Sequence, residues 1–591
     1  MEECQVKTEK EFEIGGIVYR FSCNGAVRID CAPVTADEGI TLLRVRFDWE
    51  ETQIPKKISL FYQIPCVDLY TMWDPLNRTR DLDARWRAKS GRTESRLASG
   101  MPLKGLISRK GLNRYLLAVS DVKNPLCIKM GAHERFGTED VTVDFFTMQC
   151  GPFRTYETIL RIDERSIPFD QAIVEARRWY DELGYPSAYS PNLAKQPMYS
   201  TWYSLWQDVT AEQVLRECEE AVKYGMKTVI VDDGWQTDVS GVIYGYCGDW
   251  KPTQKKFPDM RGMVDRLHAL GMKVMIWFTV PYMGYFSETY KKFEGYYLEN
   301  RDASNCSVMD PRYKHVREFM VNTYVDAVKR WDLDGLKLDF IDRFVTNGQV
   351  KEGMDFLCVE DAVEQLLREI YEALTAINPE ILIEFRQPYF GPVVGTYGNM
   401  MRVWDCPLDS VTNKNQTLNL RLISSDCAVH SDMIYWHWDD TAESVAVQLL
   451  GTLFSVPQIS VRFAELSEAH KTVLKRYLDF WNSHADTLMA PTLSLRLAEN
   501  GYSYASAVKN GEKIALAMTR AAFEMETEVK EGYLFNITDE ESIILRTEGE
   551  GRVSYEVFDC LGKRVGRRRT VRARLCEVAV PMGGMLKVTR A

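Results

Sequence analysis

The sequence predicts a multidomain protein in which a central (β/α)8 TIM barrel lies between an N-terminal β-sandwich and a small C-terminal antiparallel β domain. Three hydrophobic patterns follow one another along the chain. Residues 1–190 alternate apolar and polar positions at period two, residues 195–490 alternate strand-like and helix-like runs, and residues 495–591 return to period two. A chain of 591 residues is also too long for one compact domain, so we expect these segments to be three domains.

The two outer segments are predicted to be β-rich because their alternating runs are short and separated by turns. Such runs occupy residues 16–21, 42–47, 141–146, 513–518 and 553–558. Several short strands at this spacing are typical of a β-sandwich in the N-terminal segment. The C-terminal segment is shorter and is expected to form a small antiparallel sheet.

The middle segment contains eight runs that are typical of buried strands. They cover residues 198–206, 228–235, 273–281, 335–342, 381–387, 400–405, 433–438 and 456–462. Helix-like periodicity lies between them; residues 211–224 are one example, and Gly225 is expected to end that helix. Eight βα units in about 300 residues predict a (β/α)8 barrel. A doubly wound open sheet is the structural alternative.

Composition narrows the class of protein. The net charge of -11 argues against nucleic-acid binding, which relies on clustered Lys and Arg. No run of 18 apolar residues is present, so no membrane span is expected. Residues 1–7 are acidic and polar with no apolar stretch behind them, which predicts no signal peptide and a cytoplasmic location. Fourteen cysteines without framework spacing fit the reduced thiols of that compartment.

The sequence predicts neither a metal site nor a cofactor. It has only seven histidines, and none belongs to a His-Glu-x-x-His motif or lies near a Cys-x-x-Cys pair. A Gly-rich phosphate-binding loop is also missing from the sequence.

Acidic residues end five of the eight predicted strands, and tryptophan accompanies most of them. These acids are Asp232, Asp233, Asp339, Glu384, Asp405, Asp439 and Asp440. Catalytic residues of (β/α)8 barrels come from the C-terminal ends of the strands. Carboxylates accept hydrogen bonds from hydroxyl groups, and indole faces stack on the C–H faces of sugar rings. The pattern therefore predicts a carbohydrate pocket, the alternative being tryptophans that fill the core and acids that cap helices.

Two of these acids are candidates for the catalytic pair that glycoside cleavage requires. Asp339 stands two residues after Lys337, so both side chains point to the same side of a strand, and the cation is expected to lower the carboxyl pKa. An ionised carboxylate suits a nucleophile, although the pair could also be a structural salt bridge. Asp405 lies between Trp404 and Cys406, an apolar setting expected to raise its pKa and to suit a general acid.

Asp409 is the nearest rival of Asp405 for the role of the acid. The predicted fourth and sixth strands are not neighbours, so Asp339 and Asp405 could face each other across the barrel mouth. A separation of about 5–5.5 Å between their carboxyl groups would give retention of configuration, and about 6.5–9.5 Å would give inversion.

The order of short motifs along the middle segment resembles glycoside hydrolase family 36, the α-galactosidase family of clan D. The motifs are Asp232-Asp233-Gly234-Trp235, Gly248-Asp249-Trp250, Lys255-Lys256-Phe257-Pro258-Asp259-Met260, Leu270-Gly271-Met272-Lys273, Ile276-Trp277-Phe278, Asp310-Pro311, Lys337-Leu338-Asp339 and Arg402-Val403-Trp404-Asp405. Together, and at barrel spacing, they are fairly specific. The resemblance implies that the nucleophile is Asp339 and that the acid/base is Asp405.

The resemblance also implies a set of sugar-binding residues. Asp232 and Asp233 would hold the axial O4 and the O6 of a galactose-like ring, and Lys337 would bind near O3 and O4. The other expected substrate-binding residues are Trp202 and Trp250 at the –1 site, Arg386 on the fifth strand, and Trp235 and Arg402 from the matched motifs. Trp73 of the N-terminal segment is a further candidate for the pocket.

One segment departs from the resemblance. Many members of the family carry a Cys-Gly-Gly-Gly-type segment after the fifth strand, near the 2-position of the sugar, where this chain reads Glu384-Phe385-Arg386-Gln387-Pro388-Tyr389-Phe390-Gly391. The substituent at C2 therefore stays open. Family members are often oligomeric, which makes a homo-oligomer an expectation of the resemblance only.

The predicted function is that of a retaining, exo-acting α-galactosidase that hydrolyses oligosaccharides or other glycosides by double displacement. An α-N-acetylgalactosaminidase or another α-glycosidase of the same family, and a transglycosylase of the raffinose-synthase type, are alternatives with the same first step. A sugar-binding protein without catalysis is the alternative from another class. The aglycone and the linkage are not given by the sequence.

Overall fold

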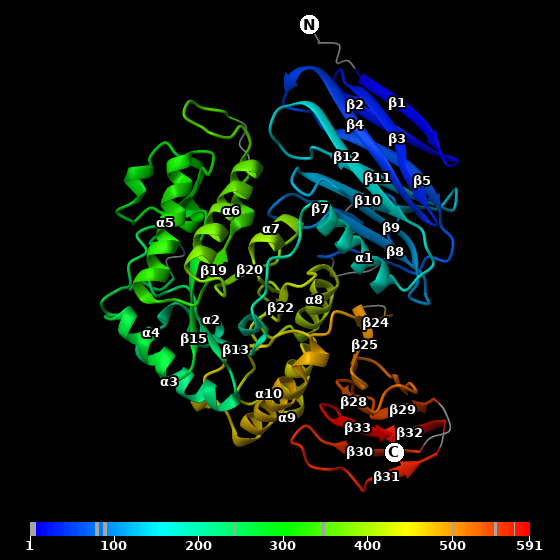
Figure 1. Ribbon diagram of the computed structural model, residues 1–591, viewed down its shortest axis with the longest axis vertical. Coiled ribbons are helices and arrows are strands. Elements are labelled where there is room, and N and C mark those ends of the chain that lie inside the picture. Colours follow the sequence, from blue (N-terminus) through cyan, green and yellow to red (C-terminus); the bar gives the residue numbers. More distant parts are fainter. Residues whose placement is uncertain are drawn as a thin grey trace.

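The computed structural model describes residues 7–76, 82–86, 91–241, 244–345, 349–498, 501–548, 552–572 and 574–590. It confirms the predicted fold class: along the chain, a β-sandwich is followed by a parallel barrel and then by a C-terminal β domain (Figure 1). Among the described residues, none of the helices combines the length and the apolar character needed to cross a membrane.

The N-terminal domain is a sandwich of two six-stranded antiparallel sheets. One sheet has the order β1 (Lys7–Ile14), β2 (Ile17–Asn24), β5 (Ile58–Pro65), β11 (Thr138–Phe145), β10 (Leu126–His133), β7 (Arg92–Ser95). The other has the order β3 (Arg28–Asp37), β4 (Ile40–Gln53), β12 (Phe153–Asp163), β9 (Asn113–Val119), β8 (Leu103–Ile107), β6 (Thr71–Trp73). Period-two alternation places rings such as Phe47 and Tyr156 in a shared core, where they stack at 5.7 Å.

The eight barrel strands are all parallel to their neighbours, and the sheet closes on itself. In spatial order they are β22 (Ala428–His430), β21 (Met400–Arg402), β20 (Leu382–Arg386), β19 (Gly335–Asp339), β15 (Lys273–Thr279), β14 (Thr228–Val231), β13 (Met198–Ser200) and β23 (Gln458–Ile459). Val456 N–H donates to the Val429 carbonyl at 2.8 Å, and Ser431 N–H donates to the Val456 carbonyl at 3.0 Å, which joins the two ends. The open-sheet alternative is therefore wrong.

Helices cover the outside of the barrel. They are α3 (Ala211–Ala221), α4 (Met260–Ala269), α5 (Lys314–Trp331), α6 (Val359–Ile377), α7 (Pro392–Tyr397), α8 (Ser410–Ile423), α9 (Ala442–Gly451) and α10 (Glu468–Leu488). After α3, a 3-10 turn over Val222–Tyr224 leads into Gly225 at φ 81°, the left-handed end that the sequence predicts. A small sheet of β16 (Tyr282–Gly284), β18 (Cys306–Met309) and β17 (Tyr297–Arg301) fills the connection between β15 and α5.

The sequence misplaces two strand boundaries that matter for the site. The expected seventh strand at 433–438 is wrong, because β22 lies at Ala428–His430 and the apolar run after it is a loop that is largely buried up to Trp436 and exposed at Trp438. A short apolar run has no periodicity that separates a buried strand from a buried loop. The expected first strand, 198–206, ends at Ser200 and is followed by the short helix α2 (Trp202–Leu205) and a 3-10 turn over Trp206–Asp208.

The C-terminal domain contains a seven-stranded and a three-stranded sheet. The larger has the order β24 (Leu493–Ala498), β25 (Gly501–Lys509), β26 (Glu512–Ala517), β28 (Glu531–Asn536), β33 (Met585–Arg590), β30 (Val553–Phe558), β31 (Arg569–Val571). The smaller has the order β27 (Ala522–Met525), β29 (Ser542–Thr547), β32 (Leu575–Ala579). Most pairs are antiparallel, and the β26–β28 and β27–β29 pairs are parallel.

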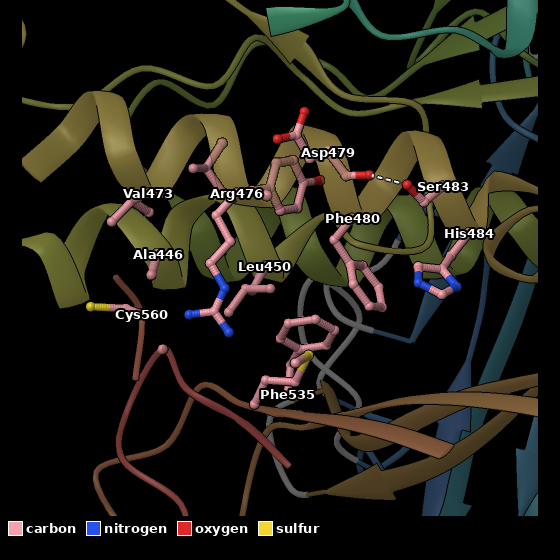
Figure 2. Close-up of a pocket in the computed structure, with 14 residues that line it drawn as sticks. Ala446, Leu450, Val473, Arg476, Asp479, Phe480, Ser483, His484, Phe535 and Cys560 are labelled. Atoms are coloured by element: carbon pink, nitrogen blue, oxygen red, sulfur yellow. Dashed lines mark hydrogen bonds between the residues drawn. The ribbon is translucent and has the colours of Figure 1, made fainter. Parts of the chain in front are cut away.

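The C-terminal domain packs against helices α9 and α10 of the barrel. An apolar cavity of about 310 Å³ lies along this contact, and the rings of Phe480 on α10 and Phe535 on β28 are 4.8 Å apart. Figure 2 shows the side chains that line this cavity. The residues that line the cavity include none of the predicted site residues. This cavity is therefore a seam between domains and not the predicted carbohydrate pocket.

Candidate active site

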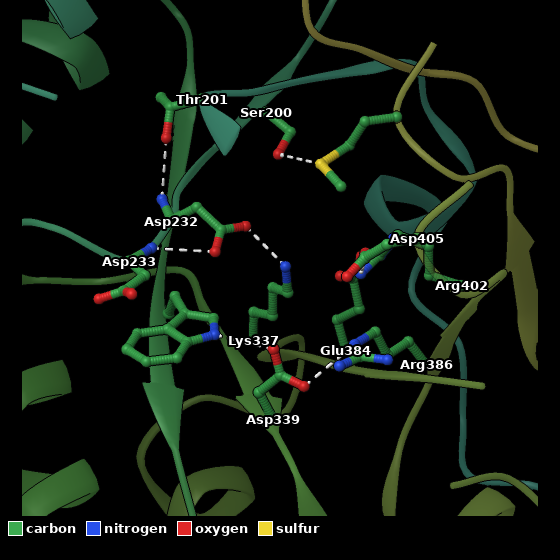
Figure 3. A network of polar contacts seen from close by, with 12 residues as sticks. Ser200, Thr201, Asp232, Asp233, Lys337, Asp339, Glu384, Arg386, Arg402 and Asp405 are labelled. Carbon is green, nitrogen blue, oxygen red and sulfur yellow. Dashed lines mark hydrogen bonds and ion pairs between the residues drawn. The ribbon is translucent and has the colours of Figure 1, made fainter. Parts of the chain in front are cut away.

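Charged side chains from four barrel strands converge at the C-terminal ends of those strands (Figure 3). They come from the ends of β14, β19, β20 and β21, the end at which barrel enzymes hold their catalytic groups. The structure thus brings together Asp232, Asp233, Lys337, Asp339, Arg386, Arg402 and Asp405.

Asp339 is the most tightly held carboxylate of this cluster. Its Oδ1 accepts hydrogen bonds from Arg386 Nε at 3.0 Å, from Phe340 N–H at 2.9 Å and from the Tyr389 hydroxyl. Its Oδ2 accepts one bond, from Trp277 Nε1 at 2.9 Å. Burial alone would raise the pKa of Asp339, but the cations of Arg386 and Lys337 outweigh burial and lower it. The pKa of Asp339 is shifted in the predicted direction, although Arg386 and not Lys337 donates a hydrogen bond to it.

Lys337 instead reaches across to the acid pair on β14. Its Nζ donates to Asp232 Oδ2 at 2.6 Å, and both side chains are buried. Asp232 N–H donates to Thr201 Oγ1 at 2.9 Å, which ties the pair to the segment after β13. The carboxylates of the pair and the ammonium group thus form one polar cluster across the barrel mouth.

The second acid of the pair is held by two glutamines. Gln207 Nε2 donates to one carboxylate oxygen of Asp233 at 2.7 Å, and Gln236 Nε2 donates to the other at 2.6 Å. Burial raises the pKa of Asp233 to about 6, and the charge of Asp232 adds to this rise against the effect of the two amides. Gly234 permits the approach of Gln207: its φ is 121°, and an added Cβ would lie 2.6 Å from the Gln207 carbonyl oxygen.

Asp405 shares a buried cation with a second carboxylate. Arg402 is fully buried; its Nη2 donates to Asp405 Oδ1 at 3.0 Å and its Nη1 donates to Asp432 Oδ1. Asp432 Oδ2 also accepts bonds from Cys406 N–H at 2.7 Å and from the Tyr203 hydroxyl at 2.9 Å. Arg402 Nε also lies 3.5 Å from Glu384 Oε1, so the guanidinium contacts two buried carboxylates and the partly exposed Asp405.

The expectation that its apolar neighbours raise the pKa of Asp405 is wrong. Burial acts in that direction, but the cations of Arg402, Arg386 and Lys337 hold the pKa of Asp405 well below its usual range. The expectation considered only Trp404 and Cys406, the direct neighbours of Asp405 in the chain. It left out the cation of Arg402, which stands three residues earlier. For Asp432, burial and the charge of Asp405 raise the pKa.

Asp409, the rival of Asp405, has a structural position. It is the N-cap of α8, and its carboxylate accepts hydrogen bonds from Thr412 N–H at 2.9 Å and from the Thr412 hydroxyl at 2.5 Å. A side chain that accepts hydrogen bonds at a helix N-terminus stabilises that helix. This geometry favours Asp405 as the acid/base candidate.

The expected tryptophans divide between the mouth and the core. Trp202 is partly exposed after β13, and Trp250 is partly exposed against Trp277 at a ring distance of 6.1 Å. Trp235 is fully buried and donates its Nε1–H to the Trp277 carbonyl at 3.0 Å, so it supports the others from behind. Trp73 is fully buried too and donates to Asn419 and Tyr502, which places it in the seam between domains and not in a pocket.

Three contributors were missed by the sequence reasoning. Asp432 was not predicted because the seventh strand was placed at 433–438. The strand ends at His430, so Asp432 follows its C-terminal end. Tyr389 stands in the departing segment after β20, and only the folded loop brings its hydroxyl to Asp339. Trp277 belongs to the matched Ile-Trp-Phe motif, which was a signal that could have identified it.

Comparison with known proteins shows which families this chain is similar to. Residues 187–388, which contain the first five barrel strands of the chain order, match the family model for melibiase. The α-galactosidase Mel36A of Lactobacillus acidophilus is 29% identical over 153 residues, which are 24% of this chain and 20% of that relative. The A type blood α-D-galactosamine galactosaminidase of Flavonifractor plautii is 23% identical over 193 residues, which are 29% of this chain and 17% of that relative. The match to each relative thus spans about a fifth of its length.

The structural likeness extends over nearly the whole chain. The crystal structure of the family 36 α-galactosidase AgaA from Geobacillus stearothermophilus matches with a TM-score of 0.63 at 15% identity, covering 97% of this chain and 81% of that chain. At this identity the match shows a shared fold. The melibiase match covers the first half of the barrel, and the match over nearly the whole chain shows the fold of a family 36 α-galactosidase.

Proposed function

We propose that this protein is a retaining, exo-acting α-galactosidase that cleaves terminal α-galactosyl residues from oligosaccharides or other glycosides. The observation that carries the proposal is the state of Asp339: a buried carboxylate, kept ionised by Arg386 and Lys337, at the end of a barrel strand. Such a group suits attack on an anomeric carbon. The α-galactosidases among the relatives and fold neighbours support the choice of sugar.

In the proposed first step, Asp339 Oδ2 attacks the anomeric carbon. This oxygen accepts one hydrogen bond, whereas Oδ1 accepts three, so Oδ2 retains more of its nucleophilic electron density. The bonds to Oδ1 fix the carboxylate plane for the attack. The product is a covalent galactosyl-enzyme, with the leaving-group oxygen protonated by Asp405.

Asp405 is proposed to act as acid and then as base. Its side chain is 42% exposed, so a bound substrate would cover it and raise its pKa toward the value that a general acid needs. After the leaving group departs, solvent returns, and the cation of Arg402 favours the carboxylate that activates water. Arg402 is buried and is proposed to position Asp405 without touching the sugar.

Recognition of the galactosyl ring is proposed for the cluster on the other side of the mouth. The carboxylates of Asp232 and Asp233 are acceptors for the hydroxyls at C4 and C6, and Lys337 is a donor beside them. Trp202 and Trp250 offer partly exposed ring faces at the same rim. This division of roles predicts that changes at Asp232 affect sugar choice, whereas changes at Asp339 abolish turnover.

The test is a panel of 4-nitrophenyl glycosides followed by chemical rescue. The α-galactoside should be hydrolysed, and Asp339→Ala should lose at least about 1000-fold in kcat, a loss typical of a missing nucleophile. Azide should then restore release of nitrophenolate from Asp339→Ala and give β-galactosyl azide, whereas Asp405→Ala should give α-galactosyl azide. Asp409→Ala is the matched control and should keep wild-type turnover.

Other outcomes would reassign the function. Turnover of the α-N-acetylgalactosaminide alone would make this chain a hexosaminidase in which the segment after β20 sets the specificity. Galactosyl transfer to acceptor sugars in preference to water would indicate a transglycosylase. Sugar binding with no turnover of any glycoside in the panel would support the binding-protein alternative.

A further inference from the structure

A polar cleft that the proposed active site does not use lies where three parts of the chain meet. It has a volume of about 650 Å³. Its walls are the turn between β8 and β9, the helix α1 (Phe169–Glu182) that follows the sandwich, and the strand β24 at the start of the C-terminal domain. None of the described residues that line it is a predicted site residue. A cleft of this size accommodates a small-molecule ligand.

Hydrogen bonds fix the three walls to one another. Phe169 N–H, at the start of α1, donates to the Gly111 carbonyl of the turn at 3.1 Å. Leu495 N–H of β24 donates to Asp170 Oδ2 of α1 at 3.0 Å. The Phe169 ring also stacks on the Tyr502 ring of β25 at a centroid distance of 6.5 Å. The shape of the cleft is therefore set by the contacts that hold the sandwich, α1 and the C-terminal domain together.

Each wall contributes at least one cation to the cleft. Arg109 and Lys110 come from the turn, Arg178 from α1 and Arg496 from β24, and all four side chains are exposed. Arg496 Nη2 lies 3.6 Å from Glu524 Oε2, whereas the ion pairs of the described residues involve neither Arg109, Lys110 nor Arg178. The protein as a whole has a net charge of -11, so three cations without a carboxylate partner in one cleft favour an anionic ligand.

The acids Asp170 and Glu175, which also line the cleft, are engaged by protein donors. Asp170 Oδ1 accepts a hydrogen bond from Gln171 N–H at 2.9 Å, in addition to the bond from Leu495 N–H to Oδ2. Glu175 Oε2 accepts a bond from Arg165 Nη2 at 2.5 Å, and its Oε1 accepts one from Gln171 Nε2 at 2.9 Å. Neither acid therefore uses the cations of the cleft, which stay available for a ligand.

The kind of cation indicates the kind of anion. Guanidinium groups bind phosphate through two parallel N–H bonds, and an ammonium group adds a compact charge. The Arg109 guanidinium lies over the Tyr70 ring at 4.8 Å, which orients the group while its N–H edge can still donate. Arg109, Lys110 and Arg178 together are thus suited to a phosphate group.

The β24 wall adds hydroxyl groups beside these cations. Ser494 and Arg496 alternate with the buried Leu493 and Leu495, so the hydroxyl and the guanidinium point to the same side of the strand. Thr492 places a second hydroxyl in the lining. Such groups exchange hydrogen bonds with the hydroxyls of a sugar. None of the described residues that line the cleft is aromatic, so a nucleobase would find no ring on which to stack.

We propose that this cleft binds a phosphorylated sugar, with the phosphate group held by Arg109, Lys110 and Arg178 and the sugar hydroxyls held by Thr492 and Ser494. The cleft is separate from the proposed galactosyl site, so the inference does not depend on the proposed function. A ligand that contacts all three walls binds the folded protein and not the unfolded chain, so it also raises the melting temperature.

Isothermal titration calorimetry on the full chain tests the proposal with glucose 6-phosphate, glucose, inorganic phosphate and AMP as probes. Glucose 6-phosphate should bind at least about tenfold more tightly than each of the others. Arg178→Gln should raise its Kd about tenfold through the lost charge, and Ser494→Ala should raise its Kd about threefold without changing that of inorganic phosphate. Arg154→Gln, at an exposed cation of β12 outside the cleft, is the matched control and should leave the Kd unchanged.

Thermal unfolding gives a second readout. Glucose 6-phosphate should raise the melting temperature of the wild-type protein and raise that of Arg178→Gln less. Equal affinity for glucose 6-phosphate and inorganic phosphate would mean that the cleft binds phosphate alone and would overturn the proposal, as would equal affinity for glucose or tighter binding of AMP. Binding that Arg178→Gln does not weaken, or that saturating galactose abolishes, would place the ligand elsewhere and refute the assignment. No binding of any probe at about 10 mM would refute it as well.

Discussion

Replacement of Arg386 by methionine tests the electrostatic argument for the nucleophile. The guanidinium donates to Asp339 Oδ1 at 3.0 Å, and both side chains are largely buried. Unit charges about 4 Å apart interact by about 4 kcal/mol at an effective dielectric constant near 20, which is an upper bound for this pair. Three other donors to Asp339 remain, so we expect its pKa to rise by about 1–2 units, or about 1.4–2.7 kcal/mol.

The sign of the effect follows from the ionisation that catalysis requires. Attack needs ionised Asp339, so a higher pKa moves the acidic limb of the kcat/KM profile to higher pH. Arg386 also lowers the pKa of Asp405, whose protonated form is the acid, so the basic limb should move in the same direction. A profile for 4-nitrophenyl α-galactoside between about pH 3 and 9 would show both shifts.

The ion pair between Arg386 and Asp339 also makes the free energy of unfolding depend on pH. Because the folded state depresses the pKa of Asp339, this group stabilises the fold above its unfolded pKa, and that stabilisation is lost as pH falls through the folded pKa. Arg386→Met should therefore lose stability at neutral pH and lose less of it near pH 3, as measured by thermal unfolding. Arg261→Met, an exposed change on α4 with the same loss of charge, is the control. An acidic limb that stays at the wild-type pH in Arg386→Met would refute the assignment of Asp339 as the required anion.

Three further substitutions test other parts of the arrangement. Asp432→Asn removes a carboxylate that competes with Asp405 for one buried guanidinium, so the basic limb of kcat/KM should fall by about one pH unit; an unmoved limb would exclude this coupling. Gly234→Ala places a Cβ 2.6 Å from the Gln207 carbonyl oxygen, and it should raise KM for an α-galactoside about tenfold with little change in kcat. Trp73→Phe removes the N–H that donates to two buried acceptors and should lower the free energy of unfolding, measured in urea, by about 1–3 kcal/mol without changing KM.

Sequence periodicity was sufficient to predict the order of the domains and most of the barrel. The strand at Lys273–Thr279 and the helix at Ala211–Ala221 carry clear patterns, and each lies where it was expected. The seventh strand was misplaced because the loop that follows Ala428–His430 is longer than the strand and equally apolar. The short strands of a closed barrel are defined by their neighbours and not by their own composition.

The candidate site was predictable where its chemistry is local in the chain. Asp339 and the pair Asp232 and Asp233 were recognisable because each acid ends a buried apolar run. The partners of these acids were not recognisable, because they come from other strands: Arg386 reaches Asp339, and Lys337 reaches Asp232, 105 positions away in the chain. The pKa of Asp405 was expected in the wrong direction because the apolar neighbours Trp404 and Cys406 were weighed without the cation of Arg402, three residues earlier, and without Arg386 and Lys337, which come from other strands.

The N-terminal sandwich contributes to the site through the loop that carries Tyr389. Gly100 N–H, at the edge of the sandwich, donates to the Pro388 carbonyl at 3.0 Å, and the Arg96 guanidinium donates to the Phe344 carbonyl at 2.9 Å. The first contact precedes Tyr389 by one residue, and the second follows β19, the strand that ends in Asp339. The sandwich therefore braces the two barrel loops whose relative position sets the hydrogen bond between Tyr389 and Asp339. A barrel expressed without this domain would keep its carboxylates but lose the support that orients the nucleophile.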